Sequence, residues 1–449
     1  MGKIRQENLE KTWHLTIGRG PTAEKRSMQR RNVLKGLAAI AALFPFRSAI
    51  AAPFQRVRPG GPGWPTAQEW ESLKTQVGGN LIKPTGLFSA CAGGKTGSGC
   101  ADTLKEIGNP FYIGDQAGGT QTSGWLNAWS PKPSAFAVAA HSADDVVAAV
   151  NFARQHRLRL VVKGGGHSYQ GTSNAPDSLL VWMRPMRAIT VHDSFVPQGC
   201  RAAPVPAVTL EAGAMWVDAY DAVTTKNGRY VQGGGCMTVG VPGLVQGGGF
   251  GSFSKRYGTA AASLLEAQIV TADGKLRTVN ACNDPDLFWA LKGGGGGSFG
   301  IVTSLTLKTH DLPEFLGGVS MTIKAQSDED FRRLLAQFVD FYTDALFNPH
   351  WGESLTFSSD NVLHISMSSA GLSTDQARAV WQPFVDWLQT QGAAFSTPGL
   401  RAHSSEARTY WDVEGMRRGG SGRRHLSHGP RRRCERCTSS ASFRGRRAR

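Results

Sequence analysis

The sequence lacks the features that mark several common protein classes. Its apolar stretch at residues 36–46 contains a proline and is far shorter than the roughly 20 helical residues that cross a bilayer, so no stable membrane insertion is expected. No dinucleotide fingerprint is followed by a ribose-binding acid about 20 residues later, and no Walker lysine–hydroxyl pair occurs. These absences disfavour a nicotinamide-binding Rossmann domain and a P-loop ATPase. No G-X-Y period and no repeat of about 20–50 residues is present, which excludes collagen and gives no sign of a solenoid.

The central part of the chain has little net charge, although the whole chain carries +16. Residues 1–51 hold ten basic and three acidic residues, and residues 416–449 hold twelve arginines and one acid. Residues 52–415 are therefore close to neutral, at −2. Because the basic excess belongs to the two ends, it gives no reason to expect that the folded body binds nucleic acid or an anionic membrane.

Glycine is the residue in excess, with 55 of 449 positions against about 7% in average proteins. Seventeen of these glycines lie between residues 233 and 300. The chain also contains 40% hydrophobic residues and 12 tryptophans, which excludes a wholly disordered protein. The clustering therefore predicts binding loops built from bare backbone within a folded domain.

The first 51 residues have the layout of an export signal. Arg30 and Arg31 are followed by an apolar residue and Lys35, then by the short apolar stretch and a small-x-small cleavage site at 49–51. This order is typical of twin-arginine export, and the alternative is an ordinary buried helix start. Twin-arginine export moves folded proteins, often with a cofactor bound. We therefore expect a cofactor enzyme that engages this machinery and is periplasmic or secreted.

Export would place the seven cysteines in an oxidising compartment. Cys91 and Cys100 flank a glycine-rich loop, so a local disulfide is predicted between them. The odd count leaves at least one thiol unpaired or otherwise committed. The other five are Cys200, Cys236, Cys282, Cys434 and Cys437.

The body is predicted to alternate helices and strands. Ser142 and the two acids after it favour the start of a helix that runs to about residue 156. The Asp273-Gly274 pair predicts a hairpin between strands at 267–271 and 275–279. Further strands are predicted at 136–139, 158–162, 179–182, 207–210, 229–232 and 301–308, and a helix at 215–225. After residue 312 glycine becomes rarer, and a second α/β unit is predicted from strands at 319–324 and 362–367 and helices at 328–346 and 374–391.

Three glycine clusters follow predicted strands or open helices. The first is Gly164-Gly165-Gly166-His167-Ser168, at the end of a strand, where bare backbone N–H groups could approach a phosphate closely. The second, residues 233–251, contains Cys236-Met237-Thr238-Val239-Gly240. The third, residues 286–302, has five consecutive glycines before Ser298-Phe299-Gly300-Ile301-Val302. Three ordered motifs over about 140 residues are far more specific than any one of them alone.

At these motifs the chain resembles the berberine bridge enzyme-like flavoproteins of the vanillyl-alcohol oxidase type. The resemblance implies an α+β fold: a two-subdomain, PCMH-type FAD-binding domain at 131–312, followed by an α/β substrate domain with an antiparallel sheet at 313–415. Residues 52–130 would pack on the FAD-binding domain. The substrate domain would be incomplete, since the strands and the Tyr/Asn-rich segment that follow in the family are not visible.

The family also implies how the cofactor is held. The first loop would wrap the FAD pyrophosphate, with His167 bonded to the 8α methyl carbon of the flavin. In bicovalent members the cysteine before Thr-Val-Gly, here Cys236, is also bonded to carbon 6. The remaining cofactor-binding residues would be Gly164, Gly165, Gly166, Ser168, Gly171, Val239, Gly240, Gly243, Gly248, Gly249, Gly251, Ile301 and Val302. A bare loop histidine and a buried free thiol are the alternatives for the two linking residues.

Two further residue roles are left open by the sequence. A small valine at position 239 resembles the oxygen-using oxidases of the family, and simple packing explains it equally well. The catalytic base of the family lies in the substrate domain as an acid or a tyrosine, and no residue here matches it. No metal site is predicted in the body.

The tail at 416–449 has a composition unlike the body. His425-x-x-His428 and Cys434-x-x-Cys437 hint at zinc, and the flanking arginines hint at nucleic acid. The ligand spacing is unlike a usual finger, so out-of-frame translation is the simpler interpretation. With so little apolar surface, the tail is expected to be disordered.

The sequence as a whole therefore predicts an exported FAD-linked oxidase. A hydride would pass from a C–H of an alcohol, sugar or related small molecule to covalently bound FAD, and oxygen would reoxidise the flavin. The alternative is a catalytically impaired, flavin-binding remnant with an incomplete substrate domain. No nucleic-acid partner is expected.

Overall fold

The computed structural model describes residues 55–94, 97–121, 128–411 and 413–417. The chain divides into Met1–Gln55 and Arg56–Arg449, and every element below belongs to the second part. The predicted export signal lies outside the described residues, as does the predicted arginine-rich tail from residue 418 onward. No helix in the described ranges is long and apolar enough to cross a membrane.

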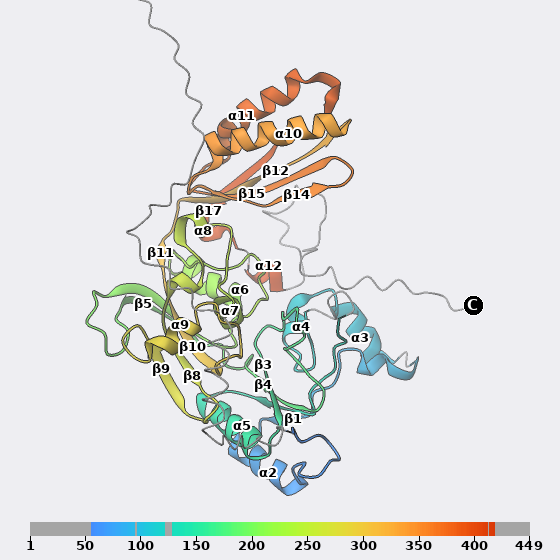
Figure 1. The fold of residues 1–449 in the computed structure, drawn as a ribbon, viewed down its shortest axis with the longest axis vertical. Coiled ribbons are helices and arrows are strands. Elements are labelled where there is room, and N and C mark those ends of the chain that lie inside the picture. Colours follow the sequence, from blue (N-terminus) through green and yellow to red (C-terminus); the bar gives the residue numbers. More distant parts are fainter. Residues whose placement is uncertain (1–54, 95–96, 122–127, 412, 418–449) are drawn as a thin grey trace, which may run out of the picture. The chain divides into compact units, whose positions relative to one another are not determined.

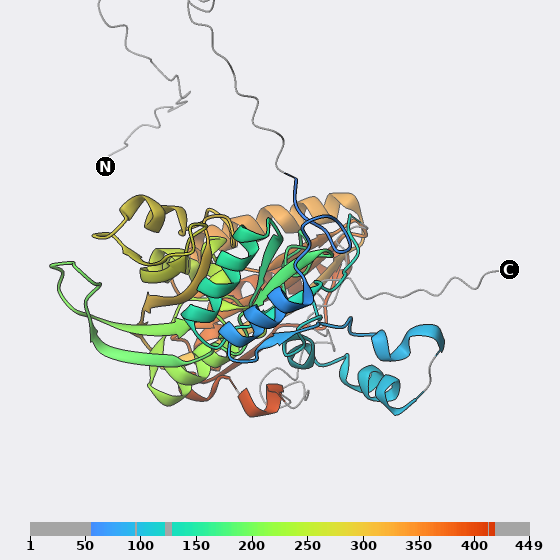
Figure 2. The same ribbon diagram turned by 90° about the horizontal axis from the view of Figure 1, so that it is seen from below.

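The first sheet is mainly parallel and has the order β1-β2-β4-β3. Its strands are β1 (Leu81–Ile82), β2 (Phe136–Ala139), β4 (Ser178–Trp182) and β3 (Arg159–Lys163). Helix α5 (Ala143–Gln155) connects β2 to β3 and begins with the predicted cap, in which Ser142 Oγ accepts from the Asp145 amide at 3.2 Å. Helix α2 (Ala67–Gln76) lies beside α5 (Figures 1 and 2), with the rings of Trp70 and Phe152 4.9 Å apart.

The second sheet is antiparallel and has the order β5-β6-β10-β8-β9. Its strands are β5 (Ile189–Phe195), β6 (Val205–Glu211), β10 (Ile301–Lys308), β8 (Leu264–Val270) and β9 (Leu276–Asn280). The predicted hairpin is confirmed, because β8 and β9 pair in antiparallel register from Glu266–Asn280 to Val270–Leu276. The short helices of this part are α6 (Trp216–Tyr220), α7 (Val241–Gln246), α8 (Ser254–Tyr257) and α9 (Pro285–Ala290), and a π-helical turn over Asp221–Lys226 extends α6.

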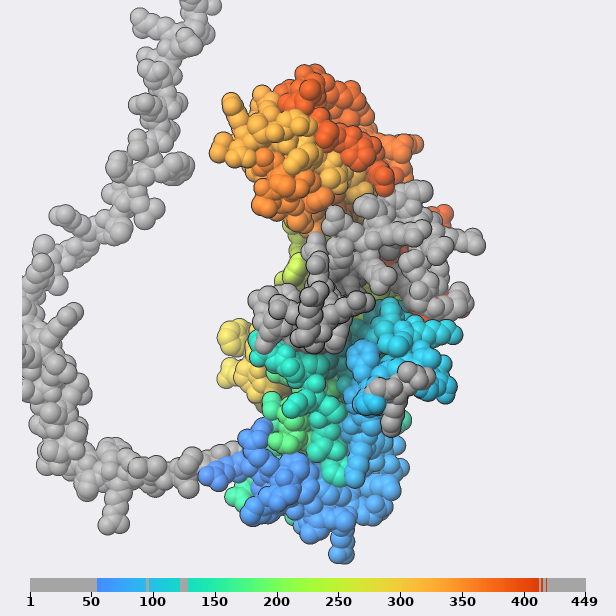
Figure 3. Space-filling view, turned by 90° about the vertical axis from the view of Figure 1, so that its right-hand side faces the viewer, coloured from blue at the N-terminus to red at the C-terminus, as the bar shows by residue number. Residues whose placement is uncertain are grey.

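A third, antiparallel sheet follows the two-stranded ribbon of β7 (Arg229–Tyr230) and β11 (His310–Asp311). Its strands are β12 (Phe315–Ala325), β13 (Trp351–Gly352), β14 (Leu355–Ser358), β15 (Val362–Ala370), β16 (Phe395–Ser396) and β17 (Arg401–Glu406). Helices α10 (Asp328–Phe341) and α11 (Thr374–Thr390) cover one face of it (Figure 1), and their apolar sides form a core around Trp381 and Phe384. Figure 3 shows this part, in orange and red, as one continuous body.

The segment before β2 is held by its own short elements and a disulfide. A 3₁₀ segment (Ser89–Gly94) precedes α3 (Ser98–Glu106) and α4 (Pro110–Gly114). Cys91 and Cys100 are bonded, as the sequence predicted, and a second disulfide joins Cys200 to Cys282. The last described helix is α12 (Val413–Arg417). The predicted fold class, mixed helices and sheets with antiparallel pairing, is confirmed.

Candidate flavin-binding site

The first glycine loop leaves the end of β3 and runs directly against the second. A Cβ added to Gly165 would lie 2.4 Å from the carbonyl oxygen of Thr238 and 2.7 Å from the amide nitrogen of Gly240. In return, a Cβ on Gly240 would lie 2.8 Å from the amide nitrogen of Gly165. Real Cβ atoms do not approach backbone this closely, so both positions require glycine for the two loops to meet.

The second loop is fixed from behind by helix α6. The amides of Trp216 and Val217 donate to the carbonyls of Val239 and Met237 at 3.1 and 3.0 Å. A Cβ on Gly233 would lie 2.2 Å from the ring of Trp216, which is fully buried. Val239 itself packs against the core of the second sheet. The position of the loop that carries Thr238 and Cys236 is therefore fixed by its contacts with helix α6 and the protein core.

His167 stands where the two loops meet. Its Nε2 atom lies 2.9 Å from the hydroxyl oxygen of Thr238, a side chain that is only 2% exposed. Burial lowers the pKa of His167 from 6.5 to about 4, against the opposing effect of a hydrogen bond with the Thr238 backbone. The imidazole is therefore neutral at physiological pH and keeps a lone pair on one nitrogen.

Cys236 lies in the second loop, three residues before Val239. A hydrogen bond of 3.2 Å from the Val239 amide to the Cys236 carbonyl closes the turn between them. The sulfur of Cys236 is disulfide-bonded. A sulfur in a disulfide cannot also be bonded to a flavin. The predicted link through Cys236 therefore requires its sulfur to be a free thiol, and it stays a prediction of the sequence alone.

The backbone of these loops fits the phosphate groups of a dinucleotide cofactor such as FAD. Among the described residues, no hydrogen bond uses the amides of Gly165 and Gly166. A Cβ added to Gly235 or Gly243 would meet no atom within 4 Å, so open space adjoins the second loop. Amides without a protein partner, on bare glycine backbone, are what a bound phosphate requires. A neutral histidine at the same place suits covalent attachment.

The other predicted site residues are distributed over the same region. Ser168 is bound within its own loop, its Oγ lying 2.7 Å from Thr172 Oγ1. Gly171 has a φ of +73° and packs on the ring of Trp129. Gly248 and Gly249 also have positive φ, and a Cβ on Gly251 would lie 1.9 Å from the Gly233 carbonyl oxygen. The buried side chains of Ile301 and Val302 pack in the cores of the first and second sheets.

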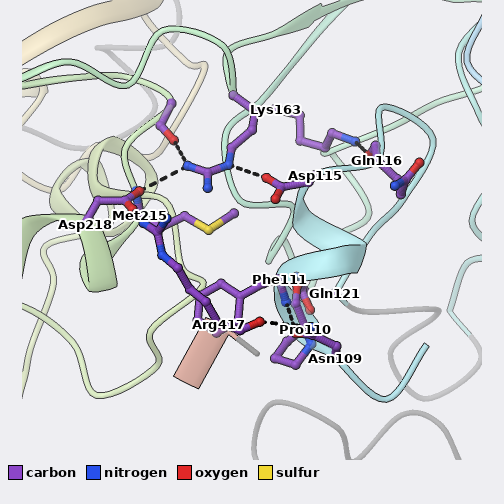
Figure 4. Close-up of polar contacts among 12 residues, drawn as sticks. Asn109, Pro110, Phe111, Asp115, Gln116, Gln121, Lys163, Met215, Asp218 and Arg417 are labelled. Carbon is purple, nitrogen blue, oxygen red and sulfur yellow. Dashed lines mark hydrogen bonds and ion pairs between the residues drawn. The ribbon is translucent and has the colours of Figure 1, made fainter. Parts of the chain in front are cut away.

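Lys163 is a residue of this region that sequence reasoning missed. It ends β3, is buried, and its ammonium donates to the carbonyl oxygen of Gln116 at 2.9 Å (Figure 4). It also donates to the carbonyl oxygens of Gly119, at 2.9 Å, and Ala117. Burial lowers its pKa to about 7. The loop that it holds reaches the glycines, because the Gln121 amide donates to the Gly166 carbonyl at 2.9 Å. A lysine directly after the apolar residues 160–162, at the start of the first glycine cluster, was the available signal.

Arg184 is a second missed residue. Its buried guanidinium donates to Asp115 Oδ1 at 2.6 Å, to the Gly213 carbonyl at 2.8 Å and to Asp218 Oδ2 at 3.1 Å. Burial acts to lower the pKa of Arg184, but the hydrogen bond and charge of Asp115 and Asp218 outweigh it and raise that pKa. Asp218 also accepts from the Met215 amide and pairs with Arg417 (Figure 4). The network joins the segment before β2 to the start of α6, which supports the second loop.

Comparison with known proteins agrees with this geometry. Residues 134–280 match the family described as FAD binding domain. Among relatives of the chain, the FAD-linked oxidoreductase ZEB1 of Gibberella zeae is 30% identical over 378 residues, which are 79% of this chain and 63% of the relative. The VAO-type flavoprotein oxidase VAO615 of Thermothelomyces thermophilus is 31% identical over 76% of this chain and 62% of its own length.

Solved structures show the same fold. The VAO-type flavoprotein MtVAO615 of Myceliophthora thermophila C1 superposes with a TM-score of 0.70 at 27% identity, covering 80% of this chain and 67% of the other. A glucooligosaccharide oxidase of Acremonium strictum, described with 6-S-cysteinyl, 8α-N1-histidyl FAD, superposes with a TM-score of 0.54 at 22% identity over 69% and 60%. The predicted resemblance to VAO-type flavoproteins is confirmed. The chain spans just under two thirds of the length of ZEB1 and VAO615.

Proposed function

We propose that this protein is an FAD-dependent oxidoreductase that holds its cofactor covalently through His167. The observation that carries the proposal is the meeting of two glycine loops at Gly165 and Gly240, with a neutral histidine beside unused backbone amides. The printed names of the relatives, FAD-linked oxidoreductase and flavoprotein oxidase, support the reaction class. The substrate would be an alcohol, a sugar or a related small molecule.

Different residues would bind the cofactor, hold the surrounding loops and form the substrate domain. The amides of Gly165 and Gly166 would bind the pyrophosphate, and Lys163 and Arg184 would hold the surrounding loops in place. When bound, FAD supplies a hydride acceptor for a C–H bond and a centre that dioxygen can reoxidise. The third sheet would form the substrate domain at 313–415, preceded by the FAD-binding domain at 131–312. No described residue is assigned as the catalytic base.

The test begins with the cofactor. Purified protein should show flavin absorbance that remains with the polypeptide after acid precipitation, and mass spectrometry should find FAD on the peptide that contains His167. His167→Ala should release all flavin in acid. His192→Ala is the matched control, because His192 Nε2 also lies 2.9 Å from a threonine hydroxyl, that of Thr209 in β6. Acid-stable flavin that remains in His167→Ala would be attributed to Cys236, whereas flavin-loaded wild type whose His167 peptide carries no FAD would refute the attachment site.

Turnover is measured separately, as oxygen consumption and peroxide formation over a panel of sugars and alcohols. Steady oxidation of any panel member supports the oxidase. Flavin-loaded protein that oxidises none of them would favour the second candidate, a flavin-binding protein without catalysis. The panel thus separates the cofactor claim from the reaction claim.

We also propose twin-arginine export. The proposal is supported by the order of Arg30, Arg31, Lys35 and the apolar stretch, and by two disulfides of the kind that persist in oxidising compartments. Replacing Arg30 and Arg31 by lysine in the full chain should leave the protein in the cytoplasm. Unchanged export of that variant would contradict the assignment.

A further inference from the structure

The contact between His167 and Thr238 raises a question that the function alone does not answer. The two residues are 71 positions apart and come from different glycine loops, yet Nε2 and Oγ1 lie 2.9 Å from each other. Thr238 is 2% exposed, so its side chain has little freedom to turn away. The backbone contact of Gly165 with Thr238 fixes the distance between the loops.

The chemistry of a neutral imidazole makes this contact selective. One ring nitrogen carries the proton and the other carries the lone pair, and only the second can attack an electrophilic carbon. When Thr238 Oγ1 accepts a hydrogen bond from Nε2–H, the lone pair lies on Nδ1. The low pKa of His167 keeps the ring in this neutral, reactive form over the physiological range.

We propose that Thr238 is a positioning residue for flavin attachment, which holds the proton on His167 Nε2 and so directs Nδ1 to the 8α methyl carbon of FAD. The inference rests on the proposed function, since it presupposes that His167 is the attachment site. It adds a residue whose hydroxyl decides which nitrogen reacts.

The attachment step balances with dioxygen as the oxidant. One C–H bond of the 8α methyl group and the N–H bond of the imidazole are broken, and one C–N bond forms between C8α and Nδ1. The two electrons and two protons released reduce dioxygen to hydrogen peroxide. The proton that leaves the ring is the one on Nε2, so Thr238 Oγ1 is also the atom that first faces the departing proton.

The chain offers a matched control for the same hydrogen bond. His192 Nε2 lies 2.9 Å from Thr209 Oγ1 between β5 and β6, and Thr209 Oγ1 also lies 2.8 Å from Thr306 Oγ1. Thr209→Val therefore removes a His–Thr contact of the same length in the same FAD-binding domain, away from the glycine loops. Any general cost of burying valine in place of threonine is shared by both variants.

The experiment follows covalent flavin incorporation. Full-length wild type, Thr238→Val, Thr238→Ser and Thr209→Val are produced in a riboflavin-limited host and then incubated with FAD in air. Total bound flavin and acid-stable flavin are measured over time. Thr238→Val should bind FAD but become acid-stable on the order of fivefold more slowly, because a hydrogen bond of this kind is worth about 1 kcal/mol. Thr238→Ser, which keeps the hydroxyl, and Thr209→Val should follow wild type.

Two results would overturn the role of Thr238. One is acid-stable incorporation in Thr238→Val at the wild-type rate. The other is a flavin peptide from wild-type protein in which NMR places C8α on Nε2, a measurement that needs no variant and stands even if Thr238→Val does not fold. A His167 peptide without FAD from flavin-loaded wild type would instead refute the proposed attachment site, so the two failures are distinguishable.

Discussion

At the scale of single residues, His167 combines burial with a chemically useful ring. Its pKa of about 4 in the folded protein lies below the value near 6.5 of an exposed histidine. Between these two values the unfolded chain binds more protons than the folded chain. The stabilising contribution of a neutral His167 is therefore complete above pH 6.5 and is lost as pH falls toward 4.

This difference gives a pH prediction for flavin-free protein. The free energy of unfolding of wild type should fall more steeply between pH 6.5 and 4 than that of His167→Ala, which has no imidazole to protonate. Urea unfolding at several pH values measures the effect. His192→Ala should keep the steeper wild-type decline. Parallel curves for wild type and His167→Ala would show that the buried environment of His167 does not resist protonation.

Lys163 supports a second prediction at this scale. Its ammonium satisfies three carbonyl oxygens of residues 116–119, and no other described side chain bonds to all three. Lys163→Met keeps the approximate length of the side chain but leaves the buried Gly119 carbonyl without a donor, at about 1–3 kcal/mol. The Gln116 and Ala117 carbonyls lose one donor each and keep the Gly119 amide and the Asn174 side chain. We expect the unfolding free energy to drop by about 3 kcal/mol, with weaker flavin retention.

The control for that change is Lys308→Met, an exposed lysine at the end of β10. Thermal unfolding and total bound flavin should be near wild type for this control. A Lys163→Met protein as stable as Lys308→Met would mean that the 116–119 loop is held by other contacts.

At the scale of elements, the local sequence pattern was sufficient to predict some helices and strands and insufficient for others. The strand predicted at 301–308 is β10, and the helices predicted at 328–346 and 374–391 are α10 with its π-helical turn and α11. The strand predicted at 229–232 is shorter, because only Arg229–Tyr230 pair with β11 before the chain enters the glycine loop. Strand β17 has exposed, mostly polar residues and was missed, since its place is set by pairing with β12.

In the candidate site, too, local motifs could be predicted from the sequence and tertiary contacts could not. The glycine, histidine and cysteine motifs could be recognised because they are contiguous in sequence. The contacts between these motifs could not be predicted, because Gly165–Gly240 and His167–Thr238 join segments more than 70 residues apart. Lys163 and Arg184 were missed for a related reason, since their partners lie in loops with no pattern of their own.

The meeting of the two loops gives an element-scale prediction. In Gly165→Ala the new Cβ would lie 2.4 Å from the Thr238 carbonyl oxygen, and neither atom belongs to a flexible side chain. The loops must separate, so FAD binding should be lost while the sheets still form. Flavin content and far-ultraviolet circular dichroism measure the two effects. Gly108→Ala, with no atom within 4 Å of its Cβ and no positive φ, is the control. Full flavin loading of Gly165→Ala would contradict the close packing.

At the scale of the whole described body, the third sheet meets the glycine-rich part through backbone and through an ion pair. A Cβ on Gly352 of β13 would lie 2.0 Å from the carbonyl oxygen of Ser252, just after the second glycine cluster. Nearby, Lys255 of α8 pairs with Glu353 and donates to the Leu346 carbonyl at 3.2 Å. Tyr342 donates to the same carboxylate at 3.0 Å.

The free energies of the two kinds of contact indicate which one couples the unfolding of the third sheet to that of the glycine-rich part. The side chains of Lys255 and Glu353 are 25% and 30% exposed, and ion pairs that reach solvent contribute about 1 kcal/mol or less. Overpacking a close backbone contact costs about 1–3 kcal/mol and forces the two surfaces apart. We therefore predict that Gly352→Ala splits the thermal unfolding of the protein into two transitions, whereas Glu353→Gln lowers the midpoint slightly and keeps one. Differential scanning calorimetry distinguishes these results. If Glu353→Gln separates the transitions and Gly352→Ala does not, the ion pair, and not the backbone contact, joins the third sheet to the FAD-binding domain.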